Sequence, residues 1–160
     1  MKALDEKSAL ADATQLNLAS QLGMDVSLET WAVAAARIHD HVAAAIHSDR
    51  PAIPASVRQI EYAATLGLDV QQDSVRVASA KIGDTLNEQN RKALIALGLK
   101  PGDAVQKTEK IEHEGTVHSF TNDYIVSSIG TNGRVYFKGT GCRSAWPSQI
   151  EKLLDDSSAI

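Results

Sequence analysis

The sequence is poor in aromatic residues, cysteine and basic charge, and each shortage limits what the protein can be. Aromatic residues make up 4% of the 160 residues, so the core must consist mainly of aliphatic side chains and alanine. A single cysteine, Cys142, excludes a disulfide framework within the chain and a cysteine-based metal site. With 16 basic and 20 acidic side chains, the net charge of −4 argues against coating nucleic acid through bulk charge.

The chain also lacks a long apolar run. No stretch approaches the roughly 20 apolar residues of a membrane-spanning helix, so we expect no membrane association. The segment Met1–Lys7 contains acidic groups and precedes no apolar segment, unlike a secretory signal peptide. These features predict a soluble cytoplasmic protein, and the apolar content of 43% predicts a globular chain rather than a disordered one.

One segment of the sequence occurs twice. Residues 15–42 match residues 59–86 without a gap at 11 of 28 positions, with an offset of 44 residues. Because a fixed-period self-match indicates a repeated structural unit, we predict two copies of a helix-turn-helix pair. One pair is too small to bury a core alone, whereas two stacked copies can share one.

Each copy contains signals for a helix, a stop and a second helix. Asp12 and Ser56 each precede a glutamine by three residues, which is the pattern of a capping box. Gly23 and Gly67 follow the first helix, where a left-handed residue would end it. Nearly every matched residue is apolar or a cap, which favours a structural interpretation of the repeat over a paired docking surface. We expect helices near residues 13–22, 29–47, 57–66 and 74–86.

Prolines and glycines divide the rest of the chain. Two prolines in the segment Ser48–Ser56 indicate a linker between the copies. Residues 89–97 predict one more helix, whose basic residues form either a solvated face or a basic edge. The expected domains are residues 1–50 for the first repeat, 51–100 for the second repeat with the extra helix, and 101–160 for a small β-domain.

After Pro101-Gly102 the hydrophobic pattern changes from the helical period to short alternating runs. Asn132-Gly133 between apolar runs is a strong hairpin signal, and Asn122-Asp123 is a second expected turn. Five short strands separated by turns are typical of a small barrel or sandwich, so the predicted fold class is α+β. The expected strands are Asp103–Thr108, Gly115–Phe120, Tyr124–Ile129, Arg134–Lys138 and Cys142–Trp146.

The last third of the chain resembles an SH3-like barrel of the Tudor and KOW kind. Gly102-Asp103 opens the first expected strand, and Gly115-Thr116-Val117 and Tyr124-Ile125-Val126 follow in the next two. Asn132–Phe137 matches the third hairpin, and Trp146-Pro147-Ser148 matches the short 3₁₀ turn before the last strand. The resemblance covers residues 101–154 and implies a five-stranded barrel that serves as a binding module.

No catalytic constellation or cofactor motif is present. The sequence contains no phosphate-binding loop and no dinucleotide or nucleophile-elbow glycine pattern, so we expect neither an enzyme nor a cofactor. His39, His41 and His47 share one expected helix, but no further ligand completes a metal site, and solvent-facing histidines are the simpler interpretation. His113 and His118 with Cys142 form a weak candidate for nucleophile and base, against a small buried cysteine.

The best candidate site is a basic and aromatic stripe on the expected barrel. Strand geometry puts Arg134, Tyr136 and Lys138 on one face and Val135 and Phe137 in the core. Such a stripe suits phosphate contacts and base stacking, although a solvated strand face is an equal alternative. The expected nucleic-acid-binding residues are Arg134, Tyr136, Lys138 and Arg143.

Two functional hypotheses follow. The first is a non-enzymatic binding protein whose barrel contacts nucleic acid while the helical repeats dock a protein partner. The second is a protein-only adaptor or inhibitor, of the kind encoded by phages or mobile elements, acting through the acidic helical repeats. Local basic charge favours the first, and overall acidity favours the second. Neither hypothesis fixes an oligomeric state.

Overall fold

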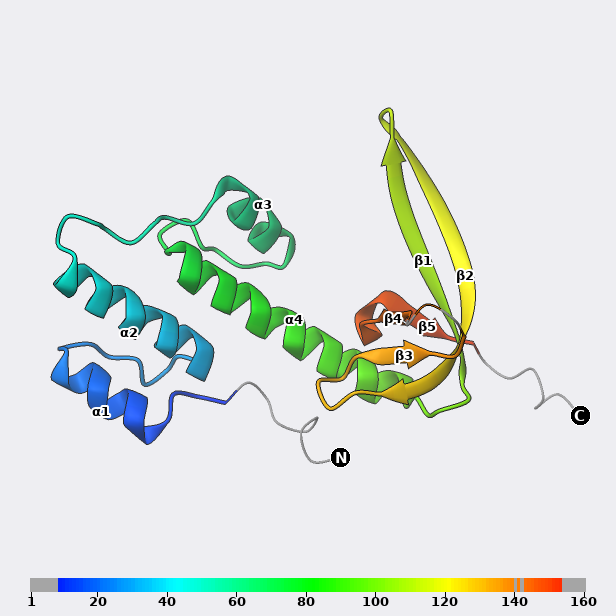
Figure 1. Ribbon diagram of the computed structural model, residues 1–160, viewed down its shortest axis with the longest axis horizontal. Coiled ribbons are helices and arrows are strands. Elements are labelled where there is room, and N and C mark those ends of the chain that lie inside the picture. Colours follow the sequence, from blue (N-terminus) through cyan, green and yellow to red (C-terminus); the bar gives the residue numbers. More distant parts are fainter. Residues whose placement is uncertain (1–8, 140, 142, 154–160) are drawn as a thin grey trace, which may run out of the picture. The chain divides into compact units, whose positions relative to one another are not determined.

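The computed structural model of the protein describes residues 9–139, 141 and 143–153. In these residues, four helices precede five antiparallel strands, so the chain has the predicted α+β composition (Figure 1). The described residues divide into a helical unit, residues 9–88, and a sheet unit, residues 89–153. None of the described helices is long and apolar enough to cross a membrane.

The predicted caps start and end the helices of the helical unit. Helices α1 (Ala13–Gln21) and α3 (Val57–Thr65) both begin with a complete capping box. The Gln15 amide donates to Asp12 at 2.8 Å, and the Gln59 amide donates to Ser56 at 3.2 Å. Gly23 and Gly67 follow these helices with φ angles of 72° and 75°, as the stop signals predicted.

The second helices of the two matching segments are α2 (Trp31–Ile46) and α4 (Val75–Leu97). The prediction of a separate helix over residues 89–97 is wrong, because α4 continues to Leu97. The polar residues between 86 and 89 include no glycine or proline, so nothing interrupts the backbone hydrogen bonds. The helix ends at Gly98, whose φ is 52°.

Buried residues of the helical unit form two small clusters. In both clusters an alanine of the first helix, a valine of the connector and an alanine of the second helix are almost fully buried. Small side chains at these points let the helices approach closely, in keeping with the shortage of aromatic residues. The first cluster is Ala19, Val26, Ala34 and Ile38, and the second is Ala55, Ala63, Val70 and Ala78.

Polar contacts in the helical unit also recur at positions 44 residues apart. The Gln15 side chain donates to the Trp31 carbonyl at 2.9 Å, and the Gln59 side chain donates to the Val75 carbonyl at 3.1 Å. Two further contacts join the segments to each other, since the Thr30 hydroxyl donates to Asp84 and the Ser74 hydroxyl donates to Asp40. The two hydroxyl–carboxylate pairs are therefore reciprocal.

The sheet unit contains a five-stranded antiparallel sheet with the order β4-β3-β2-β1-β5. A 3₁₀ turn, Pro147–Gln149, precedes β5. In the described residues β4 and β5 form two unpaired edges, so the sheet is open rather than a closed barrel. Leu94 of α4 and Leu99 join the strand residues in its hydrophobic core. The strands are β1 (Ala104–His113), β2 (Thr116–Ile129), β3 (Val135–Phe137), β4 (Ser144–Ala145) and β5 (Ile150–Lys152).

One turn prediction in the sheet is wrong. Asn122 and Asp123 do not form a turn but lie inside β2, opposite Lys107 and Gln106 of β1. The two strands predicted at 115–120 and 124–129 are therefore one strand. The real turn is Glu114-Gly115, where both φ angles are positive, 51° and 75°, as a two-residue hairpin turn requires.

Strand boundaries differ from the predictions at the C-terminal end as well. Cys142, where the fifth strand was expected to begin, lies outside the described residues, and the described strand starts at Ser144. Residues 150–152, which lie outside the expected strands, form β5 and pair with β1.

The outer half of the β1–β2 hairpin extends beyond the other strands (Figure 1). Strand β5 pairs with β1 only as far as Lys107, and β3 pairs with β2 only from Val126 onward. Residues 108–121, the β1–β2 arm, therefore pair only with each other, and all of them are exposed.

Candidate nucleic-acid interface

The predicted stripe lies on β3 and in the residues that flank it. Val135 and Phe137 are buried while Tyr136 between them is 39% exposed, so the predicted register of this strand is confirmed. Lys138 follows the strand with an exposed side chain, and its amide donates to the Ile125 carbonyl at 2.8 Å.

Small and polar residues surround Tyr136 on the outward face. The strand pairing puts Ser128 of β2 and Ser144 of β4 opposite it. Any other residue at position 130 would place its Cβ atom 3.3 Å from a carbon of the Tyr136 ring, a tight contact. Gly130 therefore leaves room for the ring. The phenol ring is therefore supported by neighbours that do not cover it.

The side chain of Arg134 is held by more contacts than a fully exposed strand residue would have. Its side chain is half-buried, and its Nε donates to the Ser144 hydroxyl at 2.8 Å. Its guanidinium carbon lies 5.4 Å from the centre of the Trp146 ring, a cation–π distance. These contacts fix the position of the Arg134 charge and make it part of the local structure as well as a candidate ligand.

Arg143 lies on the other face of the sheet. Its carbonyl accepts a hydrogen bond from the Phe137 amide at 3.0 Å, so the two residues are paired and share a face. Tyr136 and Arg143 therefore do not belong to one stripe. The stripe consists of Arg134, Tyr136 and Lys138.

Arg143 instead lines a polar pocket of about 500 Å³ with residues of β1 and β2. The Tyr124 and Phe137 rings stack there with centroids 4.5 Å apart. Lys107 donates to Glu109 at 2.6 Å, and this bond, more than the nearby charges of Lys107 and Arg143, lowers the pKa of Glu109. The cations of this pocket therefore face an ionised carboxylate, which reduces their attraction for a further anion.

Sequence reasoning missed Lys107 and Asn122, which line this pocket, and Trp146 as the partner of Arg134. Asn122 was assigned to a turn, which hid its face on β2. If residues 116–129 had been treated as one continuous strand, the alternation of side chains would have placed Asn122 on the same face as Tyr124, which also lines the pocket.

The charge distribution differs between the two halves of the sheet. From Tyr124 to Ile150 the sequence has three basic residues and no acidic one. The β1–β2 arm, in contrast, carries Glu109, Glu112 and Glu114 against the single basic residue Lys110. Positive charge is therefore concentrated around β3 and β4.

The remaining candidate residues make no catalytic cluster in the described part of the chain. His39 and His47 line one pocket and His41 lines another. His113 and His118 lie on the exposed arm. No three acidic, histidine or cysteine side chains among the described residues are close enough together to hold a metal ion.

Comparison with known proteins gives no match to a family model, a curated protein or a solved structure.

Proposed function

We propose that the protein is a non-enzymatic binding protein whose sheet unit binds single-stranded nucleic acid through the outward face of β3. The observation that carries the proposal is the exposed Tyr136 ring between Arg134 and Lys138, in a segment that has no acidic residue from Tyr124 to Ile150. A base stacks on Tyr136, while the two cations contact the flanking phosphates.

The resemblance to SH3-like barrels belongs to the same proposal. Five antiparallel strands and the 3₁₀ turn before the last strand support it. We also infer that residues 10–46 and 54–88 are two copies of one helix pair, since their caps, buried residues and side-chain hydrogen bonds recur at the same offset.

Fluorescence anisotropy with a labelled oligothymidine tests the nucleic-acid proposal. The Tyr136→Ala variant should lose roughly 1–3 kcal/mol of binding free energy, because base stacking on an aromatic ring contributes about that much. The Lys138→Ala variant should reduce the dependence of log K on log salt by about 0.7, the value for one phosphate contact on a single strand.

Two matched variants act as controls. Lys110→Ala removes the same type of side chain from the acidic arm and should leave affinity unchanged. Arg143→Ala should weaken binding less than Lys138→Ala, because Arg143 lies on the other face near Glu109. Absence of binding by the wild type at low salt, or an equal loss in Lys110→Ala, would contradict the proposal.

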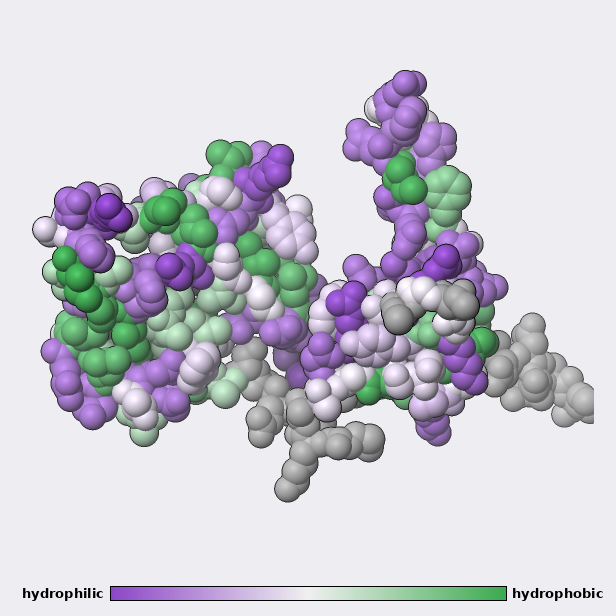
Figure 2. Space-filling view, viewed as in Figure 1, coloured by the Kyte–Doolittle hydropathy of each residue, from purple (hydrophilic) through white to green (hydrophobic). Residues whose placement is uncertain are grey.

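The helical unit supports the second part of the proposal, which is docking of a protein partner. Its described residues carry ten acidic and five basic side chains, a net charge of −5. Large hydrophobic side chains reach its surface, as the green areas over the helices in Figure 2 show. The most exposed are Leu28 at 91%, Ile53 at 73%, Val57 at 70% and Ile46 at 69%.

The same surface supports the alternative function, a protein-only adaptor. In a pull-down with the full chain, the double variant Leu28→Ser, Val57→Ser should lose a partner that Tyr136→Ala retains. If the wild type has no nucleic-acid affinity and this partner is still recovered, the adaptor function replaces the nucleic-acid proposal. A partner retained by the double variant would contradict docking on this surface.

A further inference from the structure

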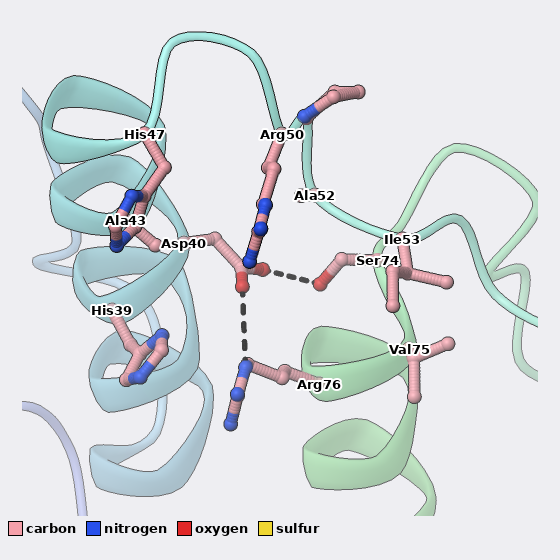
Figure 3. Close-up of a pocket in the computed structure, with 11 residues that line it drawn as sticks. His39, Asp40, Ala43, His47, Arg50, Ala52, Ile53, Ser74, Val75 and Arg76 are labelled. Atoms are coloured by element: carbon pink, nitrogen blue, oxygen red, sulfur yellow. Dashed lines mark hydrogen bonds and ion pairs between the residues drawn. The ribbon is translucent and has the colours of Figure 1, made fainter.

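Another pocket lies within the helical unit. Helix α2 forms one wall, the loop after α2 forms the top, and the first residues of α4 form the opposite wall (Figure 3). Its volume is about 500 Å³, and its lining combines small apolar residues with charged and imidazole side chains. The polar lining residues are His39, Asp40, His47, Arg50, Ser74 and Arg76.

The charge of this pocket is opposite to that of the unit around it. The described helical unit has five basic and ten acidic side chains and three histidines. Two of the basic side chains and two of the histidines line the pocket, together with a single acid, Asp40. Two arginines against one aspartate give this pocket a positive charge inside an acidic unit, and so a local site for negative charge.

Asp40 is occupied by contacts within the protein. One carboxylate oxygen accepts the Ser74 hydroxyl, and the other lies 3.6 Å from Nε of Arg76 (Figure 3). The carboxylate thus orients Arg76 while its own charge is partly compensated. In the described residues the side chains of Arg50, His39 and His47 have no hydrogen-bond or ion-pair partner, so their donors are available to a ligand.

The matching position of the other segment provides an internal comparison. There the Thr30 hydroxyl donates to Asp84, as Ser74 donates to Asp40. The residues 44 positions from His39 and Arg76, however, are Gly83 and Ala32, which carry neither an imidazole nor a charge. The hydroxyl–carboxylate pair is therefore common to both sides, whereas His39 and Arg76 occur on one side only; His47 is matched by Arg91.

This difference separates a structural role from a binding role. If His39 and Arg76 were needed to hold the two segments together, the matching positions 83 and 32 would need similar side chains. Two of the amides at the start of α4 are already used, since Val75 donates to the Ile53 carbonyl at 2.8 Å and Val77 donates to Ser74 at 3.2 Å. The binding role is therefore assigned to the side chains of the pocket.

We propose that this pocket binds a small phosphate monoester with an apolar group. Arg50 and Arg76 approach the phosphate from different elements, and guanidinium groups suit phosphate because they form paired, charge-assisted hydrogen bonds. His39 and His47 add donors, and Ile53 and Val75 contact the apolar group. A phosphate on a small molecule fits a pocket of this volume, whereas a polynucleotide would require a groove.

Phenyl phosphate is a suitable probe for this pocket, and NMR titration of the full-length protein is the measurement. Amide signals of residues 39–53 and 74–76 should shift together. Inorganic phosphate should bind at the same place more weakly, and phenol should cause no comparable shifts. Equal binding of phenol would overturn the anion site, and the absence of shifts with phenyl phosphate would overturn the whole proposal.

Variants locate the charges that matter. Arg50→Gln and Arg76→Gln should each weaken the binding of phenyl phosphate roughly 10- to 150-fold, since a charge-assisted hydrogen bond contributes about 1.5–3 kcal/mol. Arg58→Gln, an exposed arginine on α3 outside the pocket, should bind as the wild type does. An equal loss in Arg58→Gln would overturn the site. Arg50 has no partner in the described residues, so its variant tests the pocket even if Arg76→Gln is less stable.

A final competition separates the small-molecule ligand from nucleic acid. Oligothymidine without a terminal phosphate should not displace phenyl phosphate from residues 39–53. Displacement would mean that the pocket recognises the polynucleotide backbone, and the proposal would fail. The two proposed sites share no residue. Tyr136→Ala should therefore abolish the stacking of a base on the β3 face without changing the binding of phenyl phosphate to the pocket.

Discussion

The two matching segments of the helical unit agree in their internal contacts and differ on their surfaces. The capping boxes, the left-handed glycines, the buried valines and the hydroxyl–carboxylate pairs recur at an offset of 44 residues. His39, Arg76 and Leu28 have no counterpart, since Gly83, Ala32 and Gln72 occupy those positions. Positions that hold the fold together are thus the shared ones, and positions open to ligands or partners are those that differ.

The largest effect should come from the connector valines, which are both 1% exposed. Val26→Ala and Val70→Ala each remove two buried methyl groups and leave a small cavity, so each should lower the free energy of unfolding by roughly 2 kcal/mol. Urea denaturation gives the values, and Val57→Ala, at a site that is 70% exposed, is the control. Equal losses would support two equivalent cores, and a neutral Val26→Ala would contradict this.

A smaller loss is expected from the reciprocal hydroxyls. Ser74→Ala and Thr30→Ala each remove a helix cap and a donor to a half-buried aspartate, which together should cost about 1–2 kcal/mol. A double-mutant cycle between Ser74→Ala and Asp40→Asn measures the contact itself and should give a coupling of at least about 0.5 kcal/mol. Purely additive effects would show that the hydroxyl acts as a cap alone.

The glycine stops should contribute still less. No atom lies within 4 Å of a Cβ added at Gly23 or Gly67, so only the left-handed conformation opposes alanine there. Gly23→Ala and Gly67→Ala should each cost on the order of 1 kcal/mol in thermal unfolding. Gly83→Ala is the control, since it lies inside α4 in open space and alanine should stabilise the helix by roughly 0.5–1 kcal/mol.

The smallest effect is a difference in acid sensitivity between the two capping boxes. The Gln15 amide, and then the Trp31 indole, lower the pKa of Asp12 below its usual value of 3.8, whereas Ser56 does not titrate. A lowered pKa stabilises the folded state above the unfolded pKa, and this contribution disappears as the pH falls through the folded value. Asp12→Ser should therefore weaken the pH dependence of unfolding as the pH falls below 3.8.

An NMR titration of the Asp12 carboxyl carbon checks the cause directly. The midpoint should lie below 3.8 in the wild type and rise in Trp31→Phe, which removes the indole donor at 3.1 Å. A midpoint at or above 3.8 in the wild type would contradict the role assigned to the cap.

Local signals determined how much of this fold the sequence predicted. The starts of α1 and α3 and the glycine stops were found because capping residues and left-handed glycines act within a few residues. The length of α4 was missed because polar residues alone do not end a helix. The register of β3 was predicted from alternation, which exposes Tyr136 and buries its neighbours.

Non-local pairing accounts for what the sequence did not reveal. The face of Arg143 follows from its pairing with Phe137, and the place of Asn122 inside β2 follows from its pairing with Lys107. No local sequence pattern specifies either pairing. The pocket between α2 and α4 likewise joins residues that are distant in the chain, such as His39 and Arg76. Binding sites of this kind are assembled by tertiary contacts, so composition and periodicity cannot locate them.

The β1–β2 arm offers a place to modify the protein without disturbing its cores. Its turn, Glu114-Gly115, connects two exposed strands whose outer residues pair only with each other. Exposed hairpin turns of this kind tolerate insertions, because the added chain displaces no buried side chain. A short epitope or a fluorophore attached there would label the sheet unit without changing any residue of the β3 face or of the α2–α4 pocket.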